Sequence, residues 1–335
     1  MMKEHCPSEM APDLSISMVS LNRPDLVIQC LASVEEFTRS VSYEIHLVAL
    51  NYDDRALAPI LERFPRLVAH RVTGPSGYSQ NNNIALKAAK GRYAVILNDD
   101  TVLTDDLFGQ IVRVLDNEPD VVAACPVLRN PDGSIQMAVR GRFTPLSFMV
   151  EQLRLDRVIP RKWAIRLGAF DRTWLPEDAR GPIDIQTGTG ACFVVRKSAL
   201  ERIGFLDEEY FLSPDDIDWS VRLGRIGRLV LLPQASLTHY ASTTLKRSYV
   251  AVVPTVYAGC YTFMRRHYGR LSEWTVRFVL GLVWSAFLSA AWTVISVMGH
   301  SQRARIMRRA RWNCVRFAFS LASSSDVFKK LSRNP

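Results

Sequence analysis

Two acidic clusters and one late histidine are the parts of this sequence whose residue types and spacing could do chemistry. The first cluster is Asn98-Asp99-Asp100-Thr101, directly after an apolar run. Neighbouring carboxylates at a strand end can hold Mg²⁺ or Mn²⁺, because these ions prefer oxygen ligands and leave positions open for phosphate oxygens. The alternative is that the acidic turn caps the helix that follows, a role open to residues 101–106.

The second cluster is Asp215-Asp216-Ile217-Asp218-Trp219, and three further acidic residues occupy positions 207–209. Like charges this close raise each other's pKa, which suits a general base working near neutral pH. The same residues could instead cap a helix over residues 217–226, where negative charge favours the helix dipole. The two roles are compatible with each other.

His239 follows an apolar run late in the chain. A lone histidine is more often structural than a metal ligand. Its position after both acidic clusters is what makes His239 a candidate ligand.

The elements that must position these residues alternate in the first half of the chain. Apolar runs typical of strands lie at residues 14–21, 45–50, 67–72, 93–97 and 121–127, and helical patterns lie at 25–36, 79–89 and 104–115. This alternation predicts β-α-β units, and therefore an α/β fold whose mostly parallel sheet is covered by helices on both faces. Ligands bind beyond the carboxyl ends of the strands in such sheets, and the first acidic cluster lies at such an end.

The second half is less regular. Residues 130–183 begin with the turn signal Asn130-Pro131-Asp132-Gly133 and then show no clear periodicity. A strand at 191–196, helices at 198–203 and up to residue 223, and strands at 229–232 and 236–239 are predicted beyond them. We therefore assign residues 1–260 to one catalytic domain.

The six cysteines are widely spaced and form no C-x-x-C pair. This pattern argues against a disulfide framework and a zinc site, and fits a reducing compartment. Residues 1–12 are polar and lack the apolar core of a signal peptide. Together with the basic region described below, these features give the expected location, which is the cytoplasmic face of the cell membrane, reached as a peripheral, monotopic or single-pass protein.

Residues 261–335 form a separate region of strongly positive charge, with thirteen Lys and Arg against two acidic residues. This asymmetry predicts an anionic partner, either nucleic acid or a lipid surface. Residues 278–298 carry no charge and would span about 31 Å as a helix, close to the thickness of a bilayer core.

A buried core helix is the alternative for residues 278–298. If the segment contacts a membrane, a single span would leave one basic flank on the non-cytoplasmic side, whereas an in-plane or re-entrant helix would keep both flanks in the cytoplasm. Residues 303–321 interleave arginines with apolar side chains, as an interfacial helix does. We therefore favour a membrane-associated helical region over a nucleic-acid-binding tail.

The order of these pieces resembles the family 2 inverting glycosyltransferases of the GT-A fold, in particular the rhamnosyltransferase-like branch of bacterial surface-polysaccharide synthesis. The resemblance covers about residues 14–268. It is carried by residues 21–24, 77–83, 98–101, 131–136, 187–192, 204–211, 215–218, His239 and 265–269.

The resemblance implies a direct displacement at the anomeric carbon, with Asp216 as catalytic base and Mg²⁺ or Mn²⁺ held by Asp100 and His239. Residues implied on the donor-nucleotide side are Asn22, Arg23, Asn51, Asp53, Asn82 and Asp99. Residues implied on the acceptor side are Gly190, Asp215, Asp218 and Trp219. Trp219 would stack on a sugar ring, with simple packing as its alternative.

One departure from the family concerns the second strand, which usually ends in an Asp that binds the nucleotide. Here the strand ends in Leu50-Asn51, so Asn51, Asp53 or Asp54 must substitute. The first expectation for the donor is dTDP-rhamnose, followed by UDP-galactofuranose or another UDP-hexose. The expected acceptor is lipid-diphosphate-linked or a glycan, and a homodimer is left open. The alternative function is a non-catalytic nucleotide-sugar-binding or scaffold protein at the membrane.

Overall fold

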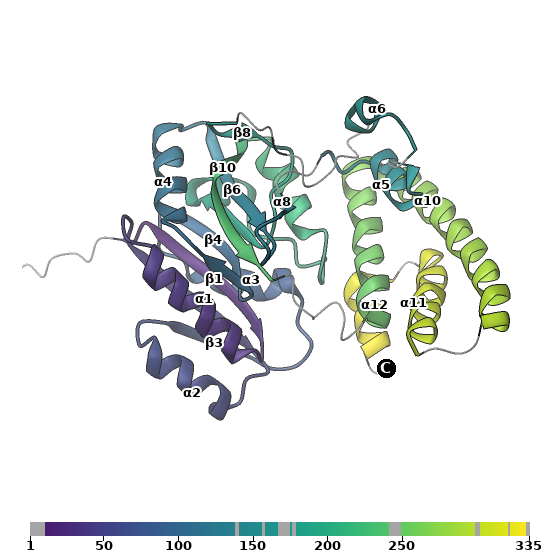
Figure 1. Ribbon diagram of the computed structural model, residues 1–335, viewed down its shortest axis with the longest axis horizontal. Coiled ribbons are helices and arrows are strands. Elements are labelled where there is room, and N and C mark those ends of the chain that lie inside the picture. Colours follow the sequence, from purple (N-terminus) through teal and green to yellow (C-terminus); the bar gives the residue numbers. More distant parts are fainter. Residues whose placement is uncertain are drawn as a thin grey trace, which may run out of the picture.

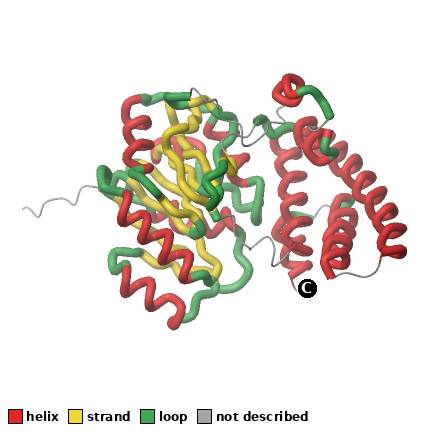
Figure 2. The backbone as a smooth tube through the Cα atoms, viewed as in Figure 1, coloured by secondary structure: helices red, strands yellow, loops and turns green. Residues whose placement is uncertain are grey.

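The computed structural model describes residues 11–137, 141–155, 158–166, 175, 179–240, 249–298, 302–320 and 322–332. An α/β part contains the sheet, and a helical part formed mainly by the C-terminal segment lies beside it (Figure 1). Figure 2 shows the same division, with the strands gathered in one part and helices alone in the other.

A sheet of ten strands, counted over the described ranges, is the centre of the α/β part. Along its main path the order is β3-β2-β1-β4-β9-β6-β10-β5, while β7 pairs with β6 and β8 with β10. The strands are β1 (Leu14–Leu21), β2 (Tyr43–Leu50), β3 (Val68–Val72), β4 (Tyr93–Asn98), β5 (Thr101–Leu103), β6 (Val121–Arg129), β7 (Ile135–Met137), β8 (Ile183–Asp184), β9 (Cys192–Arg196) and β10 (Arg228–His239). Strands β1–β4, β6 and β10 run in one direction and β5, β7, β8 and β9 run against them. The predicted α/β fold with a mostly parallel sheet is confirmed.

Helices cover both faces of this sheet. Helices α1 (Pro24–Phe37), α2 (Asp54–Arg63) and α4 (Leu107–Asn117) pack on one face. Helices α3 (Tyr78–Ala88), α7 (Lys197–Ile203) and α8 (Asp215–Leu223) pack on the other. Alternate residues of β4 enter the two cores, with Val95 in the first and Ile96 in the second. Burial on both faces explains why the parallel strands read as continuous apolar runs.

Near the first acidic cluster and His239, two elements of the structure differ from those predicted from the sequence. The helix expected from residue 104 begins at Leu107 and is capped by Asp106, whose carboxylate accepts from the Gly109 amide. Residues 101–103 form β5, which pairs with β10. Asp99 and Asp100 therefore lie in a turn between two strands, not in a helix cap. The strands expected at 229–232 and 236–239 are one strand, whose pairing with β6 shifts register between Leu232 and Ser236.

In the described parts of the irregular segment, two short helices occur, α5 (Pro145–Gln152) and α6 (Arg161–Arg166). Helix α5 begins with a capping box in which Thr144 and Ser147 exchange side-chain and backbone hydrogen bonds. Phe148 of α5 packs against α10 and not against the sheet. Helix α5 therefore lacks the apolar pattern of a helix that covers a sheet.

The C-terminal region forms α10 (Tyr249–Met298), α11 (Gln302–Ala318) and α12 (Ser324–Ser332). Helix α10 is broken at Gly269, whose φ of 85° and ψ of 169° no continuous helix allows. The expected domain boundary at residues 260 and 261 falls inside the first half of α10. That half packs on the α/β part, since Phe263 and Met264 share a core with Ile217 of α8. Within the described chain, none of the helices combines the length and the apolar character needed to cross a bilayer.

Arg277, in the second half of α10, is buried and holds α11 against α10. It pairs with buried Glu273 at 2.8 Å, lies over the Tyr261 ring at 4.3 Å, and donates to the carbonyl groups of Phe317, Ala318 and Ser320. A cation at the carboxyl end of a helix also favours the dipole of α11. Arg277 therefore fastens α11 to α10.

Arg277→Met is expected to lower the free energy of unfolding by about 3–5 kcal/mol, because Glu273 would be left buried without its partner. Urea unfolding followed by circular dichroism measures this. The double variant Arg277→Met/Glu273→Met is expected to recover part of the loss, since no charge is then left unpaired. A single-variant loss below about 1 kcal/mol, as for an exposed pair, would contradict the anchoring role.

Candidate active site

The carboxyl ends of the strands bring the first acidic cluster, Arg23 and His239 into one network. Arg23 follows β1, Asp99 and Asp100 follow β4, and His239 ends β10. Arg23 pairs with Asp99 and lies 3.9 Å from Asp100, and His239 Nε2 lies 3.3 Å from Asp100 Oδ1. Residues separated by more than two hundred positions thus meet where the strand order predicts.

The Asp99 and Asp100 side chains are both buried. Burial raises the pKa of Asp99 to about 6, although the positive charge of Arg23 favours its ionised form. Two neighbouring carboxylates withdrawn from water are costly to ionise together unless cations accompany them. Arg23 supplies one positive charge. A second cation bound beside Asp100 would therefore lower the cost of ionising both carboxylates.

His239 is held in a defined tautomer by Gln136. Gln136 Nε2 donates to Asn130 Oδ1 and to the His239 carbonyl group, both at 2.9 Å, so Gln136 Oε1 accepts from His239 Nδ1 at 2.6 Å. We assign the ring proton to Nδ1 from this network. The Nε2 lone pair then lies 3.5 Å from the Asn98 amide nitrogen and 3.3 Å from a carboxylate oxygen of Asp100. Two acceptors as close as Nε2 and this oxygen repel each other, and a cation between them would relieve the repulsion. A metal-binding histidine has this arrangement, with its other nitrogen bonded to a second group.

Asp100 and His239 therefore fit a divalent cation, but as a pair. No group of three or more His, Cys, Asp and Glu side chains suited to a metal occurs among the residues that the structure describes. Two protein ligands leave several positions for water or phosphate oxygens, the coordination that Mg²⁺ prefers with phosphate ligands.

Asp216 lies at the amino end of α8 and is partly exposed. Its Oδ1 accepts from the Ile217 amide at 2.9 Å and its Oδ2 from the Gly190 amide at 3.2 Å. The neighbouring Asp215 is buried, and burial together with the Asp216 charge raises its pKa well above the usual value. Asp216 is thus the carboxylate of this pair that is held in place and open to solvent.

Tyr78 links the two halves of the site and was not predicted. Its hydroxyl group lies 2.9 Å from both Asn98 Oδ1 and the Gly190 carbonyl oxygen, and the Gly190 amide contacts Asp216. Burial raises its pKa far above the usual value, so the phenol stays neutral. The signal was the aromatic residue after Gly77. Gln136 was also missed, although residues 131–136 carry part of the family resemblance.

Gly188 and Gly190 have different reasons to be small. A Cβ at Gly188 would lie 2.7 Å from the Phe193 ring, so packing alone requires glycine there. A Cβ at Gly190 would meet neighbours at ordinary distances, the nearest at 3.6 Å. Internal packing therefore does not require Gly190, and its acceptor role stays a prediction.

The predicted donor residues divide into two groups. Asn22, with a φ of 47°, and Asn51, with a φ of 58°, are exposed at the ends of β1 and β2, as expected. Asn51 Oδ1 accepts from the Gly74 amide, and Asp53 caps α2. Asn82 is instead fully buried, and its amide group joins Ser17 to the Tyr78 carbonyl group. The expectation that Asn82 contacts the nucleotide is therefore corrected: it fastens α3 to β1.

Two predicted acceptor residues also have other roles. Trp219 is fully buried, lies edge-on to Phe193 and donates from its indole N–H to the Gly204 carbonyl group. The packing alternative therefore holds for Trp219, and no sugar can stack on it.

Asp218 is buried and contacts Arg222 at 2.8 Å, His267 at 2.7 Å and Tyr210 at 3.3 Å. Burial opposes its ionisation, but the hydrogen bonds from His267 and Arg222 hold its pKa below the usual value. Asp218 connects α8 to α10 and does not face an acceptor. The helical period turns it away from the Asp216 side of α8.

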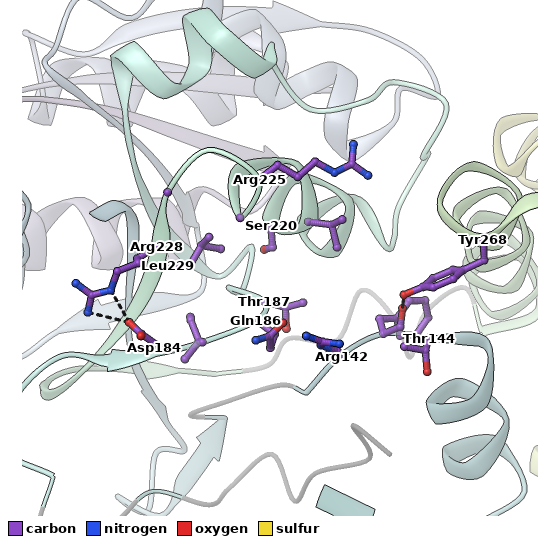
Figure 3. Close-up of a pocket in the computed structure, with 15 residues that line it drawn as sticks. Arg142, Thr144, Asp184, Gln186, Thr187, Ser220, Arg225, Arg228, Leu229 and Tyr268 are labelled. Atoms are coloured by element: carbon purple, nitrogen blue, oxygen red, sulfur yellow. Dashed lines mark hydrogen bonds and ion pairs between the residues drawn. The ribbon is translucent and has the colours of Figure 1, made fainter. Parts of the chain in front are cut away.

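A cavity of about 510 Å³ lies along the carboxyl-terminal half of α8. Figure 3 shows Thr187, Ser220 and Arg142 around it, with Arg228 paired to Asp184 at one end and Tyr268 at the other. None of the acidic-cluster residues Asp99, Asp100, Asp215 and Asp216 lines it. It adjoins the site through Ser220, whose hydroxyl group donates to the Asp216 carbonyl group at 2.6 Å.

Comparison with known proteins gives a consistent set of matches. A family model described as glycosyltransferase like family 2 matches residues 12–258. The O-antigen biosynthesis protein RfbC of Myxococcus xanthus is 27% identical over 252 residues, which are 71% of this chain and 18% of the relative. The N-acetylglucosaminyl-diphospho-decaprenol L-rhamnosyltransferase of Mycobacterium tuberculosis is 26% identical over 209 residues, which are 57% of this chain and 62% of the relative. The chain thus spans less than two thirds of each relative.

Two solved structures share the fold. One is GalNAc-T7 with UDP, GalNAc and Mn²⁺, with a TM-score of 0.52, 16% identity and coverage of 77% of this chain and 51% of that one. The other is the mannosyltransferase PcManGT from Pyrobaculum calidifontis with GDP-Man and Mn²⁺, with a TM-score of 0.52, 14% identity and coverage of 93% and 88%. At this identity they establish the architecture of the sheet and its helices.

Proposed function

This chain belongs to the glycosyltransferase like family 2, and from that premise we propose that it moves a sugar, with inversion, from a nucleotide-sugar donor to a lipid-diphosphate-linked or glycan acceptor. The observation that carries the proposal is the continuous network from His239 and Asp100 through Asn98, Tyr78 and Gly190 to Asp216. It joins a candidate cation-binding pair to a candidate base.

In this proposal Asp216 accepts the proton of an acceptor hydroxyl group as that oxygen attacks the anomeric carbon. Its two hydrogen bonds from backbone amides fix the carboxylate without neutralising it. A divalent cation on Asp100 and His239 would neutralise charge on the departing nucleoside diphosphate. Arg23, paired with Asp99, lies at the same strand ends and adds positive charge beside the donor.

The first donor we propose is dTDP-rhamnose, with a UDP-hexose next. The name of the mycobacterial relative, a rhamnosyltransferase acting on a diphospho-decaprenol, supports both the sugar and a lipid-linked acceptor. The cavity along α8 begins one helical turn from Asp216 and offers room for an extended acceptor. The excess of positive charge in residues 261–335 supports work at the cytoplasmic face of the cell membrane.

The test is transfer of labelled sugar from dTDP-rhamnose, UDP-hexoses and GDP-mannose into a lipid extract, with Mn²⁺ or Mg²⁺ present. Transfer from dTDP-rhamnose is the expected result, and transfer from a UDP-hexose alone would replace the proposed sugar. If no donor is consumed although the donors bind, the non-catalytic alternative takes the place of the transferase proposal.

Gln136→Leu is expected to raise the Mn²⁺ concentration for half-maximal activity about 10- to 100-fold, because His239 would lose the partner that fixes its tautomer. A metal titration of the initial rate measures this. Gln136→Glu keeps an acceptor for His239 Nδ1 and is the matched control, with a smaller expected effect. Equal metal requirements in both variants and the wild type would contradict the role of Gln136.

A further inference from the structure

The second half of α10 and the end of α11 expose a set of large apolar side chains, here called the docking face. It consists of Leu271, Trp274, Phe278 and Leu282 on α10, and Phe319 just after α11, with exposed fractions of 82%, 44%, 56%, 53% and 53%. Single exposed apolar residues are ordinary, but a contiguous group marks a binding surface.

These five residues form one surface. The α10 members are spaced by three, four and four residues, so they lie along one side of the helix over about 16 Å. The Phe319 ring lies against the backbone of α10 at Gly281, where a Cβ would approach it to 2.6 Å. Between residues 271 and 286 of α10, the other exposed residues are Thr275 and Ala286, and both are uncharged.

The opposite side of α10 already has its partners within the chain. Val276 and Leu280 are buried in the core shared with α8, and Arg277 fastens α11. The helix therefore does not need the docking face to fold onto the protein. Figure 1 shows this half of α10 at the far end of the helical part, away from the sheet.

The charge around the docking face is strongly positive. Of the two acidic residues among positions 261–335, Glu273 is buried against Arg277, which leaves Asp326 as the acidic residue on the surface. Arg270, at the start of this half of α10, and Arg316, on α11, are exposed. Aromatic and aliphatic side chains flanked by arginines are typical of helices that lie in a membrane interface.

We propose that the docking face inserts its side chains into the interface of an anionic lipid bilayer, with α10 lying along the surface and the exposed Arg270 and Arg316 on the lipid phosphates. Each basic residue near such a surface adds attraction, and the apolar stripe adds burial. A second copy of the chain is disfavoured, because pairing two docking faces would bring two regions of high positive charge together. The proposal deepens the membrane location included in the proposed function.

The test uses the full chain and sedimentation with vesicles of phosphatidylcholine, with or without phosphatidylglycerol, at low and high salt. The wild type is expected to bind the anionic vesicles, and more weakly at high salt. Phe278→Ser/Leu282→Ser is expected to lower the partition coefficient about tenfold or more. The matched control Leu146→Ser, an exposed apolar residue of α5, should bind as the wild type does.

Thermal unfolding of each variant verifies that the double variant remains folded. Equal vesicle binding by the double variant and the wild type would overturn the proposal. So would a wild-type dimer that the double variant converts to monomers, since a second copy would then cover the face. Release of nucleoside diphosphate from a soluble donor is measured in parallel, so that a failed transferase assay with intact vesicle binding counts against the transfer proposal alone.

Discussion

Asp216→Asn is expected to lower the turnover number about 10²- to 10⁴-fold, because an amide cannot take the proton of the acceptor hydroxyl group. Donor affinity should change little, since Asp216 contacts the Gly190 and Ile217 amides and no predicted donor residue. Steady-state transfer rates and donor calorimetry separate the two quantities.

Asp215→Asn is the matched control for this variant. The raised pKa of Asp215 means that it holds its proton more readily than an ordinary carboxyl group, and its buried Oδ2 has no hydrogen-bond partner among the described residues. A neutral amide therefore resembles its native state, and the effect on turnover should be much smaller. Turnover by Asp216→Asn at the wild-type rate, or an equal loss in both variants, would contradict the assignment of Asp216 as the base.

Asp100→Asn is expected to lower nucleoside diphosphate release about 100-fold or more and to weaken Mn²⁺ binding in calorimetry. Asp100 is the carboxylate that faces His239 Nε2 at 3.3 Å, and loss of its charge leaves the histidine as a single ligand. Chelation of the metal should have the same effect on the wild type as the substitution.

Asp53→Asn is the control for charge removal near the strand ends. Asp53 caps α2 after β2, whereas Asp100 follows β4 and His239 ends β10. Asparagine caps a helix about as well as aspartate. Stability and metal binding should therefore stay near the wild-type values. If Asp100→Asn binds Mn²⁺ as tightly as Asp53→Asn does, the metal site lies elsewhere.

The meeting of Asp99, Asp100 and His239 could be predicted from the sequence because it follows from strand order. Parallel strands end at the same edge of a sheet, so polar residues after each apolar run converge whatever their separation along the chain. The bounds of β1 also match the predicted apolar run at residues 14–21. The reason here is burial, since a strand buried on both faces has a sharp boundary in the sequence.

The roles of Asp218 and Trp219 could not be predicted in this way. Their side chains leave α8 in directions set by what packs against it, and the partners are Phe193 of β9 and His267 of α10. Gln136 reaches His239 from the irregular segment, which has no period from which to place a side chain. Such residues depend on tertiary contacts that local pattern does not encode.

In the basic region, residues 261–335, the net charge could be predicted from the sequence, but not which arginines lie on the surface. Its composition predicts an anionic partner, but Arg277, one of its thirteen cations, is turned inward to hold α11. Charge counts describe the surface only after such internal pairs are removed. Which side of α10 is exposed could not be predicted, because an unbroken run of uncharged residues does not show which of its sides packs against the protein. The structure shows it.

The central claim is that a divalent cation on Asp100 and His239 serves sugar transfer from a nucleotide donor. Its most direct test is nucleoside diphosphate release from dTDP-, UDP- and GDP-sugars with Mn²⁺, repeated after EDTA and after metal is restored. We predict release from one donor that EDTA abolishes and Mn²⁺ restores. Release that EDTA leaves unchanged, or no release from any donor with acceptor lipid present, would contradict the claim.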